Sequence, residues 1–235
     1  QASGAAGLLV ASPSNPTGTM LEPERLGALI ETCRQRRMWF VSDEIYHGLT
    51  YTLPARSALS FSDDVIVINS FSKYFSMTGW RVGWMVVPPA LVRSVERLGQ
   101  NLYISAPAAS QAAALAAFEA AGELEANRSV YAANRRLLLD GLPKVGIAEF
   151  APADGAFYLY ADVSAFIPHE FADSAAMAAS MLEELDIAVT PGIDFDEARG
   201  INFLRFSYSG PTADMAEAVR RLEGWDKLKG RSSSA

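Results

Sequence analysis

The residues best suited to chemistry lie in the segment Ser70 to Trp84, which reads SFSKYFSMTGWRVGW. Lys73 in this segment follows an apolar β-type run at 65–68. A lysine amine just past a buried strand is costly unless it has a function, and one known function is to form a Schiff base with the carbonyl cofactor pyridoxal phosphate. Arg81 and Ser70 would suit the phosphate of that cofactor, because guanidinium and hydroxyl groups donate to phosphate oxygens. Taken alone, the segment is better explained as a surface lysine in a turn.

Two further candidate groups follow strand-like runs. Asn15 lies in the turn SPSNPTGT after the run GLLVA, and Asp43 follows the run WFVS. In open α/β sheets ligands bind outside the carboxyl ends of the strands, so Asn15, Asp43 and Lys73 are expected to converge there. A carboxylate such as Asp43 keeps a pyridine nitrogen protonated, while Asn15 and Tyr46 suit the phenolic oxygen of the ring. Asp43 alone could be a cap and Asn15 part of a tight turn, but their order favours a cofactor site.

Arg205 lies inside the apolar strand-like run FLRF. An arginine in a buried strand needs a partner, and a substrate carboxylate can accept two parallel hydrogen bonds from it. A structural salt bridge is the alternative. His47 and Phe157 are candidates for the neighbourhood of the pocket, although a packing role explains them equally well.

Composition excludes several classes of protein. The chain has 235 residues and a formal net charge of -7, which argues against a general nucleic-acid or anionic-membrane binder. It has one cysteine, Cys33, and two histidines, so neither an internal disulfide nor a metal centre is expected. We find no signal peptide and no apolar run long enough to span a bilayer, which predicts a cytoplasmic protein.

The pattern of elements predicts an α/β fold. Strand-like runs at 7–11, 39–42, 65–69 and 83–87 alternate with an amphipathic helix over 23–37, which indicates a largely parallel sheet. An alanine-rich helical segment over 106–142, broken near Gly122, follows. Beyond it we expect strands at 148–150, 156–161, 187–190 and 203–208, a helix near 172–185 and a last helix after Pro211. The predicted domains are therefore 1–122 and 123–235, the second comprising a connector helix and a small α/β domain. The tail at 230–235 is expected to be disordered.

Four segments in this order resemble the fold-type I, class I/II pyridoxal-phosphate-dependent aminotransferases: SPSNPTG, SDEIYHGL, SFSKYFSMTGWRVGW and NFLRFSYS. The segment DGAFYLYADV is also similar to a strand that enters the small domain of that family. The resemblance covers essentially the whole chain, and the lysine segment is highly specific. It implies an incomplete large domain of the pyridoxal-phosphate-dependent transferase type, followed by a smaller C-terminal domain.

The resemblance also implies a role for each candidate residue. Lys73 would hold pyridoxal 5'-phosphate as a Schiff base and, once freed, would shuttle a proton. Asp43 would pair with the pyridine nitrogen, and Tyr46 and Asn15 would contact the phenolic oxygen. The remaining roles are phosphate binding by Ser70 and Arg81, and clamping of the substrate α-carboxylate by Arg205, with Asn15 beside it.

One departure from the family is that its members are longer at the N-terminal side. The missing part normally supplies a phosphate-binding loop, a ring that stacks on the cofactor and several strands. The resemblance further implies that the full-length protein is a homodimer that acts on an amino acid and a 2-oxo acid. The 235 residues alone are expected to be weakly active or inactive, with a sheet edge and apolar surface exposed.

Two alternative functions stay open at this point. A carbon–sulfur lyase can be built on the same fold, since fold does not settle chemistry. An aminotransferase-like regulatory domain would belong to another class, although the acidic balance and the lack of a helix-turn-helix segment weigh against it. The sequence does not select which amino acid is the substrate.

Overall fold

The computed structural model describes residues 4–228, so the tail at 230–235 lies outside the described residues. The chain forms two compact units. The first unit comprises Gln1–Ser14, Met20–Ala126 and Asp154–Ala156, and the second comprises Asn15–Thr19, Asn127–Ala153 and Phe157–Ala235. Each unit thus contains a short segment from within the other's stretch of sequence. The domain boundary expected at residue 122 stays a prediction.

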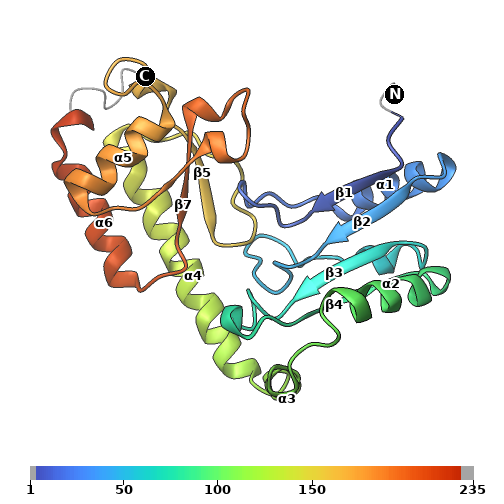
Figure 1. Ribbon diagram of the computed structural model, residues 1–235. Coiled ribbons are helices and arrows are strands. Elements are labelled where there is room, and N and C mark those ends of the chain that lie inside the picture. Colours follow the sequence, from blue (N-terminus) through green and yellow to red (C-terminus); the bar gives the residue numbers. More distant parts are fainter. Residues whose placement is uncertain (1–3, 229–235) are drawn as a thin grey trace. The chain divides into compact units, whose positions relative to one another are not determined.

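The first unit is built on a four-stranded sheet in the order β1-β2-β3-β4. Its strands are β1 (Gly7–Ala11), β2 (Trp39–Asp43), β3 (Ile66–Ser70) and β4 (Gly83–Val86). The first three are parallel, and their arrows point the same way in Figure 1, whereas β4 pairs antiparallel with β3. The expected α/β architecture with a mostly parallel sheet is therefore confirmed.

Helix α1 (Pro23–Gln35) supplies the core on one side of this sheet. Proline is tolerated at the first position of a helix, where its missing N–H has no intrahelical partner anyway. Leu26, Ile30 and Cys33 are buried and pack with Phe40 and Val67 of the sheet. The predicted apolar face of this helix is confirmed, with Leu29 partly buried beside it.

Three helices follow β4: α2 (Pro89–Leu102), α3 (Ala108–Ala117) and α4 (Ala121–Gly141). The break that was expected near Gly122 falls at 118–120 instead, because α3 ends just before Phe118 and α4 starts at Ala121. The sequence reading did not predict α2. None of its residues is buried, and Val92, Leu98 and Leu102 are exposed along it.

The second unit contains a three-stranded antiparallel sheet in the order β5-β7-β6. Its strands are β5 (Tyr158–Asp162), β6 (Thr190–Pro191) and β7 (Phe203–Ser207), and its later helices are α5 (Ser174–Leu185) and α6 (Thr212–Gly224). Short 3₁₀ turns complete the two units: η1 (Ala58–Ser60), η2 (Thr78–Trp80), η3 (Leu142–Val145), η4 (Ser164–Phe166), η5 (Gly192–Asp194), η6 (Gly200–Asn202) and η7 (Asp226–Leu228).

Three of the expected strands in this region are shorter than predicted. The strand expected over 156–161 begins at Tyr158, because Ala156 has a left-handed backbone with φ of 59°. The strand expected over 148–150 is reduced to one bridge between Phe150 and Ala161. Only Thr190 of the run 187–190 pairs in the sheet. Apolar composition predicted these runs, but pairing depends on backbone geometry that composition does not record.

Within residues 4–228 the structure has no helix that is both long enough and apolar enough to cross a membrane.

Candidate functional site

Lys73 lies in a tight turn directly after β3. The turn is closed by backbone hydrogen bonds from Met77 N to the Phe71 carbonyl and from Ser76 N to the Lys73 carbonyl, both 3.0 Å. The Thr78 hydroxyl adds a 2.7 Å bond to the Ser72 carbonyl. These bonds fix the backbone on both sides of Lys73, so the amine is presented from a defined position.

Aromatic rings hold this turn against the rest of the first unit. Phe71 and Phe75 lie on either side of Lys73 in the sequence, with ring centroids 4.7 Å apart. Phe71 also contacts Trp84 of β4 at 5.0 Å and Phe118 at 5.4 Å, in edge-to-face arrangements. Such pairs add to the stability that burial of the rings provides. The lysine turn therefore rests on a packed cluster rather than on a mobile loop.

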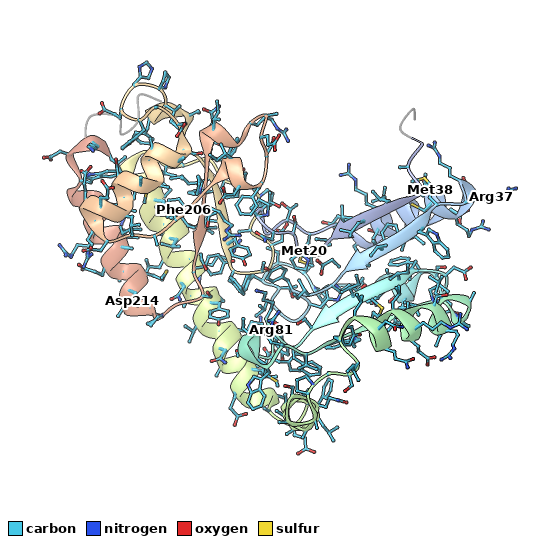
Figure 2. All side chains as sticks on the ribbon, viewed as in Figure 1. Met20, Arg37, Met38, Arg81, Phe206 and Asp214 are labelled. Atoms are coloured by element: carbon cyan, nitrogen blue, oxygen red, sulfur yellow. The ribbon has the colours of Figure 1, made fainter. Side chains whose placement is uncertain are left out.

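Ser70 and Arg81 line one pocket of about 380 Å³ in the first unit. Arg81 has a left-handed backbone with φ of 52°, and its Nη1 donates to the Thr78 carbonyl at 2.7 Å. Figure 2 shows Arg81 beyond the carboxyl end of β3, whereas Arg37 and Met38 lie at the opposite end of the sheet. Ser72 lines the same pocket, and the Ser70 hydroxyl lies 3.0 Å from the Ser72 hydroxyl.

Asp43 and Tyr46 lie at the carboxyl end of the neighbouring strand, β2. Asp43 is the last residue of β2 and pairs in register with Ala11 and Ile68. Its Oδ1 accepts a hydrogen bond from Ile45 N at 3.1 Å. The Tyr46 ring is buried, and Lys73 Nζ lies 5.9 Å from its centroid. The parallel pairing of β2 and β3 thus brings the two turns to the same end of the sheet.

A buried carboxylate, Glu44, follows Asp43 directly and was not singled out from the sequence. Its Oε2 lies 3.3 Å from His47 Nδ1, and His47 Nε2 lies 3.1 Å from the Ser12 carbonyl oxygen. Burial lowers the pKa of His47, while the nearby Glu44 carboxylate opposes that shift. His47 was expected near the pocket or in packing, and its contacts lie at the base of the Asp43 turn.

Arg205 and Asn15 meet in the second unit. Arg205 is in the central strand β7, where it pairs with Tyr160 on one side and Thr190 on the other. Its Nη1 donates to Asn15 Oδ1 at 2.7 Å, and its Nη2 donates to Thr190 Oγ1 at 3.0 Å. Neither partner carries a charge, which differs from the structural salt bridge considered as the alternative.

Two aromatic rings cover the Arg205 guanidinium. Its Cζ lies 4.4 Å from the Tyr158 ring centroid and 4.8 Å from the Phe195 ring centroid. Its Nε is buried and has no hydrogen-bond partner among the described residues. A planar cation held between rings keeps its fork in one orientation, which suits a carboxylate that accepts two hydrogen bonds.

The structure thus groups the seven predicted residues in two sets, one in each unit. Five lie at the carboxyl ends of β2 and β3 in the first unit, and two lie together in the second unit: Asp43, Tyr46, Ser70, Lys73 and Arg81, then Asn15 and Arg205. Sequence reasoning missed Ser72, Thr190, Tyr158 and Phe195. The Ser-Phe-Ser spacing at 70–72 could have indicated Ser72, but the other three come from distant segments with no pattern of their own.

The donor set fits pyridoxal phosphate. The first unit offers an amine, a carboxylate, a tyrosine and a pocket with two serine hydroxyls and a guanidinium, which match the aldehyde, the ring nitrogen and the phosphate of that cofactor. The orphaned Arg205 Nε, flanked by donors on the same guanidinium, fits an additional anionic ligand. Among residues 4–228 there is no group of three or more metal-ligating side chains.

Comparison with known proteins identifies the family of the chain. The family model described as Aminotransferase class I and II matches residues 1–222. The chain therefore belongs to the class I and II aminotransferase family.

Among curated proteins, the chain is 48% identical over 223 residues to a valine–pyruvate aminotransferase of Mycobacterium tuberculosis, covering 93% of this chain and 56% of the relative. It is 34% identical over 221 residues to the (5-formylfuran-3-yl)methyl phosphate transaminase of Methanocaldococcus jannaschii, covering 92% of this chain and 56% of the relative. The chain thus spans a little over half the length of the curated relatives that it matches.

Solved structures give the same result. A crystal structure of an aminotransferase from Mycobacterium tuberculosis is 49% identical, with a TM-score of 0.89 over 94% of this chain and 57% of that one. The aspartate aminotransferase of Thermus thermophilus with maleate is 30% identical, with a TM-score of 0.84 over 93% of this chain and 56% of that one.

Proposed function

We propose that the protein transfers an amino group between an L-amino acid and a 2-oxo acid, using pyridoxal phosphate attached to Lys73. The observation that carries this proposal is the position of Lys73 in the fixed turn after β3, 5.9 Å from the Tyr46 ring and beside the strand that ends in Asp43. Membership of the class I and II aminotransferases supports the same activity.

Each residue of the first unit would have a separate role. Ser70, Ser72 and Arg81 would donate hydrogen bonds to the phosphate, and Asp43 would keep the pyridine nitrogen protonated. When bound, pyridoxal phosphate supplies a ring that accepts electrons from the substrate α-carbon. Lys73 Nζ would take the proton from that carbon and return it during the transfer.

In the second unit, Arg205 would bind the substrate α-carboxylate with its two terminal nitrogens. Asn15 Oδ1 already accepts from Nη1, so the amide nitrogen of Asn15 would be left to donate to the cofactor. This binding mode leaves the substrate side chain unspecified. Relatives named for valine–pyruvate and for aspartate transfer are both similar to this chain, so the preferred amino acid stays open.

Covalent trapping tests the cofactor and its lysine together. The full protein is incubated with pyridoxal phosphate, reduced with borohydride, digested and analysed by mass spectrometry. We expect the added mass on the peptide that contains Lys73 and its loss in Lys73→Ala, with Lys144→Ala as the matched control that keeps it. Modification of other lysines only, with Lys73 unmodified, would contradict the proposal.

Acceptor dependence separates transamination from the lyase alternative. An aminotransferase needs a 2-oxo acid to turn over repeatedly, whereas a carbon–sulfur lyase releases ammonia and pyruvate without one. We expect the new amino acid to form only when a 2-oxo acid is supplied. Release of ammonia without an acceptor would instead support the lyase.

Three wider properties belong to the same proposal and are supported only by the sequence and the family resemblance. They are a homodimer, a cytoplasmic location, and weak or absent turnover by the 235 residues on their own. Robust transamination by a purified, mass-verified 235-residue chain would contradict the last of them.

A further inference from the structure

Glu44 is a charged side chain held almost entirely away from solvent, with 3% of its surface exposed. Its Oε1 accepts hydrogen bonds from the Ser42 hydroxyl at 3.1 Å, the Ser57 hydroxyl at 3.0 Å and Ala58 N at 2.8 Å. These donors join the turn after β2 to the start of η1. Because Oε1 accepts three bonds, Oε2 is the oxygen left to face His47.

The His47 ring has an acceptor opposite each of its nitrogens. Nδ1 lies 3.3 Å from Glu44 Oε2, and Nε2 lies 3.1 Å from the Ser12 carbonyl oxygen. A neutral imidazole carries one N–H and cannot donate to both. Donation from both nitrogens therefore requires one proton more than a neutral histidine and an ionised carboxylate hold together.

We propose that Glu44 and His47 hold one proton between Oε2 and Nδ1, and that this pair is a positioning element for the site. His47 Nε2–H then donates to the Ser12 carbonyl, three residues before Asn15, while Ser12 N donates to the Asp43 carbonyl at 3.3 Å. The pair thereby links the segment that leads to Asn15 with the turn that carries Asp43. Its effect on the cofactor rests on the proposed function.

Two surrounding features support a shared proton. The charged groups that act on His47 are the carboxylates of Glu44 and Asp43, which favour a proton on the ring and oppose the lowering of the His47 pKa that burial causes. Ser12 itself is fixed from another side, because its hydroxyl accepts from Leu21 N at 2.9 Å. The His47 bond therefore meets a carbonyl that is already held in place.

Nuclear magnetic resonance of the histidine rings tests the proton without reference to any cofactor. The chain has two histidines, and His169 is exposed, so it serves as an internal control. At about neutral pH, in the range where an ordinary histidine titrates, we expect a proton on His47 Nε2 and a second low-field proton close to Nδ1. Glu44→Gln should keep the first and lose the second. A bare Nε2, or a wild-type spectrum without the second proton, overturns the proposal.

Cofactor affinity tests the positioning role. His47→Phe removes the hydrogen bond to Ser12 and should raise the dissociation constant for pyridoxal phosphate about tenfold. The substitution His169→Phe, at an exposed position, should leave this constant unchanged. Glu44→Gln should bind like wild type above the ordinary histidine pKa, because its amide donates to Nδ1 in place of the shared proton. On acidification a protonated His47 would face that amide N–H, so the affinity of Glu44→Gln relative to wild type should fall.

The outcomes separate the positioning role of Glu44 and His47 from the proposed function. Unchanged affinity in His47→Phe, or a loss in Glu44→Gln as large as in His47→Phe above the histidine pKa, overturns the positioning role. If the wild-type protein does not bind pyridoxal phosphate at all, the proposed function fails, and the ring spectra still decide whether the proton is shared.

Discussion

Arg205 combines a charge, two neutral hydrogen-bond partners and two ring contacts in the middle of a sheet. A guanidinium in this setting is not interchangeable with an ammonium group, which lacks the planar fork and stacks poorly on rings. Asn15 and Thr190 would remain able to accept hydrogen bonds after a change to lysine. The change to lysine would therefore keep the positive charge and lose the planar hydrogen-bonding geometry.

We accordingly predict that Arg205→Lys lowers kcat/KM for amino-acid substrates by about ten- to a hundredfold, the loss expected when a charged bidentate hydrogen bond is broken. The measurement is steady-state kinetics with a fixed 2-oxo acid. Arg220→Lys is the matched control, because Arg220 pairs with Glu217 on the exposed surface of α6. Equal kinetics for Arg205→Lys and wild type would count against a carboxylate-binding role.

Glu217 gives a prediction about pH at the same scale. Hydrogen bonds from Arg220 and Arg221 lower the pKa of this carboxyl from 4.5 to about 2. A carboxyl whose pKa is lower in the folded state stabilises the folded protein at pH values above its unfolded-state pKa. This stabilisation disappears as the pH falls toward the folded-state pKa. Glu217→Gln should therefore unfold at a lower temperature than wild type at neutral pH, with a difference that shrinks between pH 4.5 and 2. A difference independent of pH would show that the charge plays no part.

At the scale of elements, the two turns that carry the first-unit residues are packed against each other. Gly48 follows the Asp43–His47 turn with φ of 92°, and a Cβ built on it would lie 2.6 Å from the ring of Tyr74, the neighbour of Lys73. The Tyr74 hydroxyl donates to Glu125 at 2.9 Å, which limits how far the ring can shift. The close approach of the two turns thus depends on a residue without a side chain.

Gly48→Ala should lower the free energy of unfolding by about 1–3 kcal/mol through backbone strain and overlap with the ring. Gly122→Ala is the control, since no atom lies within 4 Å of a Cβ there and the residue is in α4. In a helix, alanine in place of glycine should leave the stability unchanged or raise it by up to ~1 kcal/mol. Thermal unfolding followed by circular dichroism would compare the two; equal losses would refute the steric argument.

The aromatic cluster around Phe71 is the second structural feature at the scale of elements. Phe71 is buried and contacts Phe75, Trp84 and Phe118, so Phe71→Ala should destabilise the protein by about 3–5 kcal/mol, as for other buried rings. Denaturant unfolding measures this loss. The exposed Phe61→Ala is the control and should cost much less. A small loss for Phe71 would mean that the lysine turn is held by its backbone bonds alone.

At the scale of the whole molecule, the sequence predicted the elements with strong patterns. The strands β1, β2 and β3 and the amphipathic helix α1 were placed to within a few residues, because apolar patterning and turn chemistry both marked them. The edge strand β6 was misjudged because it pairs over only two residues. The helix α2 was missed although Leu91, Val95, Leu98 and Leu102 recur in it at helical spacing. Lys73 and Asp43 could be singled out because they stand at or just after the ends of these strands.

The rest of the candidate site could not be predicted, because it depends on pairing between distant segments. Tyr158, Thr190 and Phe195 surround Arg205 only after β5, β6 and the turn after β6 assemble around β7. Glu44 was concealed beside Asp43, where a second carboxylate looks like an ordinary polar neighbour. Its burial and its four partners are visible only in three dimensions.

The exchange of short segments between the two units has a consequence for dissecting the protein. Residues 15–19 belong to the second unit although both flanking stretches belong to the first, and residues 154–156 are the reverse case. No single cut of the polypeptide can separate the two units, because a cut at any position leaves a piece of one unit on the fragment that carries the other. Separately expressed halves are therefore poor substitutes for the joined chain, and a permuted gene that keeps both exchanged pieces in place would be the better tool.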